Sequence, residues 1–197
     1  MNNKLDNGQK KIKCTDIITG NGKFIGSHFH LGYKIMQNSY IFSEKEERKI
    51  DKAVYMINWI ILNTEYLQQI VKRKFCNISG RNVAARIKYA YLTTEIEIVE
   101  NLKDTKGNLV LGLSIPNKNR IWLNSKRLQK SELDIARTIF HEVIHSLGFV
   151  HSRHEFINIF GELLKYYYDI NSQKIQNEYH LFLKKRNKTG GVHTLTD

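Results

Sequence analysis

Residues 141–151 read His-Glu-Val-Ile-His-Ser-Leu-Gly-Phe-Val-His, a pattern of the form H-E-x-x-H-x-x-G-x-x-H. Two histidines four residues apart on a helix lie on one face, so the imidazoles of His141 and His145 can reach a single metal ion. Glu142 points about 100° around the helix from His141. That direction suits a general base beside the metal better than it suits a metal ligand.

Gly148 ends this helix in the interpretation that we favour. Glycine adopts the left-handed backbone that terminates a helix and turns the chain sharply. After such a turn, His151 can return toward the other two histidines as a third ligand. Three protein ligands with one open position are typical of a catalytic zinc site, whereas a structural site has four. The pattern therefore predicts one catalytic Zn²⁺ bound by His141, His145 and His151, with Glu142 as the general base.

Other side chains offer alternatives for the metal. A carboxylate on the following helix, Glu155 or Glu162, is a second candidate for the third ligand, but the glycine turn favours His151. His28 and His30 would share one face of a strand, because side chains alternate along it. We expect them to be a surface or packed pair, because a complete ligand set exists elsewhere. The alternative for the whole motif is an amphipathic core helix with ordinary hydrogen-bonded histidines.

The composition predicts a single globular domain. Hydrophobic residues make up 41% of the 197 residues, enough for a sizeable core, and 25% charged residues is ordinary. No apolar run reaches about 18 residues, so we expect no transmembrane segment. Residues 1–13 are rich in Lys and Asn and lack the apolar core of a signal peptide. We therefore expect a cytoplasmic protein, or one exported by a signal-less route.

The formal net charge of +12 is high, with 31 Lys and Arg against 19 Asp and Glu. Such a charge favours acidic substrates, nucleic acid or an anionic membrane surface as partners. The lysines are scattered along the chain rather than gathered into blocks, which favours a solvated basic surface. No compact nucleic-acid-binding motif is found in the sequence.

Hydrophobic periodicity and cap residues predict the secondary structure. Ser43 and Glu46 form a capping box ahead of one helix, and Ser131 opens the helix that carries the motif. Residues 83–92 fit the start of a helix or a strand equally well. The predicted helices cover 44–62, about 64–73, 131–147, 156–167 and 174–185, and the predicted strands cover 23–25, 29–31, 95–100, 109–115 and 120–124.

This order of elements predicts an α+β fold. We expect a twisted mixed sheet with a backing helix and a metal-bearing helix, followed by a small helical C-terminal lobe. Residues 14–185 would form one catalytic domain, with lobes over about 14–148 and 149–185 and a cleft between them. Residues 1–13 are predicted to be disordered, and residues 186–197 to be a flexible tail.

The motif resembles that of the metzincin clan of zinc metallopeptidases. Gly148-Phe149-Val150-His151, followed by Arg153, is most similar to the astacin-type members. The resemblance implies a zincin-like fold in which His141, His145 and His151 are zinc ligands and Glu142 is the base. It also implies a peptide substrate bound in extended form along an edge strand, which we expect within residues 109–124.

The chain departs from the metzincin pattern in one respect. Metzincins place a methionine turn beneath the metal, downstream of the third histidine, whereas the methionines here are Met1, Met36 and Met56. Small zincins of the SprT, WLM and YgjP-like kind also lack that turn and are the second resemblance. Some have a serine directly after the third histidine and an aromatic residue soon after, as Ser152 and Phe156 are here. Several act on DNA-linked proteins, which would suit the basic charge.

The predicted function is that of a zinc metalloendopeptidase. It would hydrolyse peptide bonds through a zinc-activated water, with Glu142 as the general base. The alternatives are a small zincin acting on or near nucleic acid, a non-proteolytic zinc-containing binding protein, and hydrolysis of a non-peptide amide. The presence of Glu142 favours hydrolysis over binding alone, because a purely structural metal site does not need that carboxylate.

Overall fold

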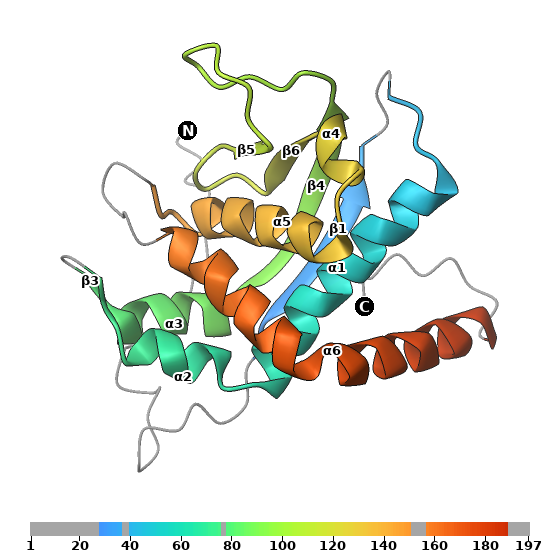
Figure 1. The fold of residues 1–197 in the computed structure, drawn as a ribbon. Helices are drawn as coiled ribbons and strands as arrows, with labels where there is room; N and C mark the ends of the chain where they lie inside the picture. Colours follow the sequence, from blue (N-terminus) through green and yellow to red (C-terminus); the bar gives the residue numbers. More distant parts are fainter. Residues whose placement is uncertain (1–27, 37–39, 76–77, 151–156, 189–197) are drawn as a thin grey trace, which may run out of the picture.

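The structure is a computed structural model that describes residues 28–36, 40–75, 78–150 and 157–188 (Figure 1). Within these ranges, helices and strands are interspersed up to β6 (Arg120–Asn124), and three helices follow it, the last of them long. Their bounds are β1 His30–Ile35, α1 Glu44–Asn63, α2 Tyr66–Val71, β2 Lys74–Phe75, β3 Ile78–Ser79, α3 Gly80–Lys88, β4 Tyr91–Val99, β5 Gly112–Ser114, β6 Arg120–Asn124, α4 Ser125–Leu128, α5 Glu132–Ser146 and α6 Ile157–Lys188.

The main sheet has four strands in the order β1-β4-β6-β5. β1 and β6 each pair with β4 in parallel, whereas β5 runs antiparallel to β6 at the edge of the sheet. The prediction that an edge strand lies within 109–124 is confirmed, although β5 is shorter than the predicted 109–115. Leu109, at the start of the predicted strand, instead forms an isolated antiparallel bridge with Lys103.

The two faces of this sheet differ as the alternation of side chains requires. The inner face carries Ile96, Ile98, Ile121 and Leu123, all of which are buried. The helices α1 and α5 pack on this face (Figure 1). On the outer face, polar residues pair across the strands: Arg120 donates two hydrogen bonds to Glu95, and Trp122 Nε1 donates to Glu97 Oε2 at 2.8 Å.

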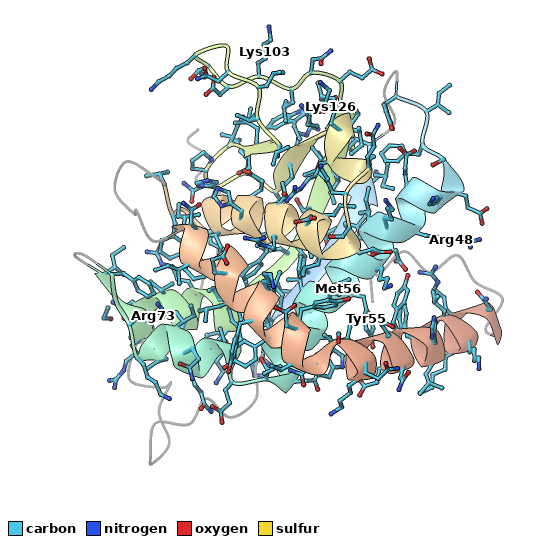
Figure 2. The ribbon with its side chains drawn as sticks, viewed as in Figure 1. Arg48, Tyr55, Met56, Arg73, Lys103 and Lys126 are labelled. Carbon is cyan, nitrogen blue, oxygen red and sulfur yellow. The ribbon has the colours of Figure 1, made fainter. Side chains whose placement is uncertain are left out.

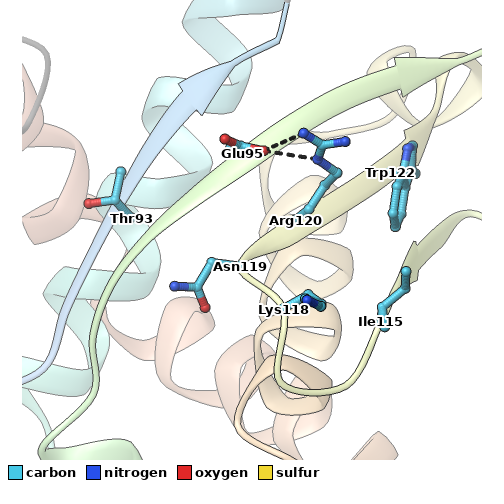
Figure 3. Close-up of a pocket in the computed structure, with 7 residues that line it drawn as sticks. All are labelled: Thr93, Glu95, Ile115, Lys118, Asn119, Arg120 and Trp122. Carbon is cyan, nitrogen blue, oxygen red and sulfur yellow. Dashed lines mark hydrogen bonds and ion pairs between the residues drawn. The ribbon is translucent and has the colours of Figure 1, made fainter. Parts of the chain in front are cut away.

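A shallow groove lies on the outer face, where β4 extends past the start of β6 (Figure 3). The ion pair between Glu95 and Arg120 lies at its centre, and both side chains are about 40% exposed. The side chain of Trp122 borders it on one side (Figure 3). The lining residues are Thr93, Glu95, Ile115, Lys118, Asn119, Arg120 and Trp122.

The backing helix α1 begins where the capping box predicts. Ser43 accepts a hydrogen bond from the Glu46 main-chain N–H, and the Glu46 carboxylate accepts one from the Ser43 N–H. Its apolar stripe is buried against the sheet and α5. Asn58 joins the helix to the sheet, because its side chain accepts from the Leu31 N–H at 2.9 Å and donates to the Leu31 carbonyl at 2.8 Å.

Two predictions on either side of Gly80 can be compared with the structure. The second predicted helix restarts as α2 rather than continuing α1. Residues 83–92 contain both predicted structures, because α3 runs to Lys88 and β4 begins at Tyr91. A Cβ at Gly80 would lie 2.1 Å from the Ile70 carbonyl oxygen, so only glycine allows α3 to start this close to α2.

The prediction of two helices after the motif is wrong, because α6 is one continuous helix of 32 residues. The pattern of apolar residues is interrupted near residues 169–174, but these residues include no proline or glycine that would end the helix. The second half of α6 packs on α1 instead of ending. Tyr179 donates to the buried Asp51 carboxylate at 2.8 Å, and Trp59 Nε1 donates to Glu178 Oε2 at 2.6 Å.

The architecture is α+β, with a four-stranded mixed sheet, a backing helix and a C-terminal helix, as predicted. The helix α6 packs across both α5 and α1, forming a further layer over them (Figure 1). None of the helices in the described ranges is long and apolar enough to cross a membrane. The predictions for residues 1–13, 23–25 and 189–197 lie outside the described residues, and α6 continues to Lys188.

Basic side chains are spread around the molecule. Figure 2 shows Arg48, Arg73, Lys103 and Lys126 at well-separated positions, and all four are exposed. They come from α1, the turn after α2, the loop between β4 and β5, and α4. This dispersal agrees with the scattered lysines of the sequence and with a solvated basic surface.

Candidate metal centre and general base

The helix α5 presents the motif. Ser131 caps its start by accepting a hydrogen bond from the Asp134 N–H at 3.1 Å, and the first turn is acidic, which complements the helix dipole. One side of the helix is fully buried against the sheet and neighbouring helices, which fixes the direction of the others. Its core residues are Ile135, Ala136, Ile139, Phe140, Val143 and Ile144.

His141 and His145 lie together at the C-terminal end of α5, as the sequence predicts. Their ring centroids are 4.9 Å apart, and the ring planes are inclined by 78°. Both side chains are half-buried. Two imidazoles one helical turn apart at this separation provide two nitrogen donors on one side of the helix.

Gly148 forms the predicted left-handed turn. Its φ is +89°, in the region that favours glycine. The Gly148 N–H donates to the His145 carbonyl at 2.8 Å, and the Phe149 N–H donates to the Ile144 carbonyl at 3.3 Å. These two bonds form the Schellman motif that ends many helices at a glycine. Phe149 then packs fully buried behind the turn.

The same turn fixes the orientation of His145. Its Nδ1 lies 2.6 Å from the main-chain carbonyl oxygen of Phe149. A carbonyl only accepts, so this contact favours the neutral tautomer that carries its proton on Nδ1. A histidine that binds a metal through one nitrogen commonly donates the other N–H to such a partner. The contact with the Phe149 carbonyl is of this kind.

Glu142 is buried between α5 and the edge strand β5. Its side chain is only 5% exposed. The Ser114 hydroxyl donates to Glu142 Oε2 at 2.8 Å and also lies 3.2 Å from the Glu142 carbonyl oxygen. Burial raises the pKa of Glu142 to about 7, and the hydrogen bond from Ser114 opposes part of that rise. A carboxyl group with a pKa near neutrality can both accept and return a proton.

Gly112 and Ser114 were not identified from the sequence as parts of this site. They lie two residues apart on β5, so both face α5, while Leu113 between them faces the other way. A Cβ at Gly112 would lie 2.7 Å from Thr138 Cγ2 and 3.0 Å from Glu142 Oε1. The missing side chain therefore makes room for the carboxylate. The signal in the sequence was the alternation of side chains along the predicted strand, which places residues two apart on the same face.

Replacement of Gly112 by alanine should destabilise the protein by about 1–3 kcal/mol, because the added methyl group overpacks the space beside Glu142 and Thr138. Urea unfolding measures the loss. Gly161→Ala on α6 is the control, since a Cβ there meets its nearest atom at 3.6 Å, an ordinary contact. We expect that control to match or exceed wild-type stability, because alanine favours a helix. Equal stability of the two variants would show that Gly112 is not closely packed.

The third predicted ligand, His151, lies outside the described residues, as does the alternative Glu155. The other alternative, Glu162, forms an ion pair with Arg137 of α5. Because this ion pair occupies the Glu162 carboxylate, it favours His151 over Glu162 as the third ligand. Within the described ranges, no group of three His, Cys, Asp or Glu side chains is placed to hold a metal. The candidate donors within these ranges are the imidazoles of His141 and His145, a ligand type that zinc accepts.

The second histidine pair is packed rather than arranged as a ligand set. His28 stacks on Tyr89 with ring centroids 5.9 Å apart, and His30 stacks on Tyr91 at 4.7 Å. His30 lies on the face of β1 opposite the buried Leu31, away from α5. The prediction of a surface or packed pair is confirmed.

Comparison of the chain with protein-family models, with curated proteins and with solved structures gives no match.

Proposed function

We propose that this protein is a zinc metalloendopeptidase with a zincin-like domain. The observation that carries the proposal is the position of Glu142, which is buried beside the paired histidines and bonded to the edge strand of the sheet. The resemblance of residues 141–151 to the metzincin motif supports it. The lack of a methionine after His151 also keeps the small zincins of the SprT, WLM and YgjP-like kind as a candidate family.

In this proposal, His141, His145 and His151 hold one Zn²⁺. Zinc, when bound, lowers the pKa of a water molecule and polarises the carbonyl of the scissile bond. Glu142 takes a proton from the attacking water and delivers it to the leaving amine. The Ser114 hydroxyl holds Oε2 of that carboxylate, which leaves Oε1 to exchange the proton. The low exposure of Glu142 keeps bulk water away from the transferred proton.

The edge strand β5 supports a polypeptide as the substrate. It pairs with β6 along one side, so its other side presents main-chain N–H and C=O groups to an incoming strand. An extended peptide adding to this edge would gain main-chain hydrogen bonds regardless of its side chains. Because Ser114 belongs to β5, such a peptide would lie next to the strand that positions Glu142.

The zinc content of the purified chain tests the proposal. Elemental analysis after dialysis should find about one zinc per wild-type chain, the stoichiometry of a mononuclear catalytic site. His145→Ala and His151→Ala should each lose most of it, because either change removes one of three ligands. Glu162→Ala is the matched control and should retain zinc, since that carboxylate is paired with Arg137.

Two results would contradict parts of this proposal. A folded wild type without zinc would remove the metal centre and favour the alternative of a non-proteolytic binding protein. Loss of zinc from Glu162→Ala with retention in His151→Ala would move the third ligand to α6.

The zinc-loaded wild type should also cleave an unfolded protein substrate in a chelator-sensitive manner. Cleavage of amide substrates other than peptides would favour the non-peptide alternative.

A further inference from the structure

Arg86 lies over the turn that ends α5, although it is far from the motif in sequence. Its Nη1 is 3.4 Å from the Leu147 carbonyl oxygen, and its Cζ is 5.3 Å from the centroid of the Phe149 ring. A guanidinium above an aromatic face is attracted by the ring quadrupole. Arg86 belongs to α3, so these contacts connect α3 to the C-terminal end of the motif helix.

The turn is enclosed on both sides. A Cβ at Gly148 would lie 3.7 Å from Arg86 Nη1 and 3.1 Å from Asn117 Oδ1. Asn117 belongs to the loop between β5 and β6 and has a φ of +62°. The turn at Gly148 therefore lies between α3 and this loop.

We propose that Arg86 is a positioning residue for His145, acting through Phe149. The Phe149 carbonyl holds the His145 imidazole with Nδ1 protonated, and Arg86 restrains both the ring of Phe149 and the carbonyl two residues before it. Without the guanidinium, the turn gains freedom, and the carbonyl no longer selects one orientation and tautomer of His145. The effect on zinc binding rests on the proposed function, whereas the effect on the tautomer does not.

The experiment compares Arg86→Gln with Arg81→Gln, an exposed arginine at the start of the same helix. Nitrogen-15 NMR of the imidazoles in the metal-free full chain reports the His145 tautomer. Chelator competition gives the zinc dissociation constant. Wild type and Arg81→Gln should show protonated Nδ1, and Arg86→Gln should show a mixture of tautomers. The zinc affinity should fall about tenfold in Arg86→Gln and should not change in Arg81→Gln. A tenfold loss is at the lower end of the effects seen when a hydrogen-bond partner of a metal-binding histidine is removed.

Arg86→Lys keeps a cation above the ring but loses the planar fork, so it should restore part of the zinc affinity. Unchanged tautomer and unchanged zinc affinity in Arg86→Gln would overturn the inference while leaving the proposed function intact. A wild type that binds no zinc would overturn the proposed function, and the tautomer comparison would still decide the role of Arg86. Because Arg86 is exposed on α3, we expect every variant to fold.

Discussion

Glu142→Gln should abolish most peptide hydrolysis while leaving zinc bound. Glutamine keeps the size of the side chain and can still accept the hydrogen bond from Ser114, so the geometry beside α5 is preserved. It cannot take up a proton, and general acid–base catalysis is worth about 10²–10⁴-fold in rate. We expect a loss of that size in kcat, measured as cleavage of an unfolded protein substrate by zinc-loaded enzyme.

The matched control for this loss is Glu97→Gln, which makes the same chemical change on the outer face of the sheet. It should cleave at the wild-type rate, because Glu97 interacts with Trp122 rather than with the motif. Hydrolysis at the wild-type rate by Glu142→Gln would rule out the carboxylate as the base. Loss of both zinc and activity in Glu142→Gln would instead mean that Glu142 is a metal ligand.

The same Glu142→Gln substitution should stabilise the metal-free protein at alkaline pH. Burial raises the pKa of Glu142 from its ordinary value of 4.5 to about 7 in the folded state. Between these two values the folded chain binds more protons than the unfolded chain, so the free energy of unfolding falls as the pH rises. The loss amounts to about 3 kcal/mol above pH 7, at 1.36 kcal/mol for each pKa unit. Glutamine carries no charge at any pH and avoids this loss.

Urea unfolding of both proteins in the presence of a chelator measures the difference. At pH 4.5 the two free energies of unfolding should be similar, because the carboxyl group is protonated in the folded wild type. The variant should become progressively more stable than wild type as the pH rises to 8. A difference that does not vary with pH would mean that the pKa of Glu142 is the same in the folded and unfolded chains.

The parts of the site that depend on local spacing could be predicted from the sequence. His141 and His145 come together because a helix repeats every 3.6 residues, and α5 is specified by its cap and its apolar face. The turn at Gly148 follows from the backbone that glycine permits. These features involve residues within one or two helical turns, so they need no knowledge of the tertiary structure.

The parts that depend on distant segments could not be predicted in the same way. The contact of Ser114 with Glu142 joins residues 28 positions apart, and it depends on how β5 packs against α5. The contact of Arg86 with Phe149 requires the packing of α3. The continuity of α6 was missed because its exposed middle lacks an apolar stripe, although its two ends are fixed by packing on α5 and α1.

The shortness of β5 bears on solubility. A sheet edge that accepts one extended polypeptide can accept any other, including a second molecule of this protein, and long exposed edges promote aggregation. The exposed Leu111 and Ile115 on either side of the strand would strengthen such pairing. With only three residues, Gly112–Ser114, the edge offers few hydrogen bonds to an unintended partner. The brevity of the strand thus limits self-association at the edge where the proposed substrate would bind.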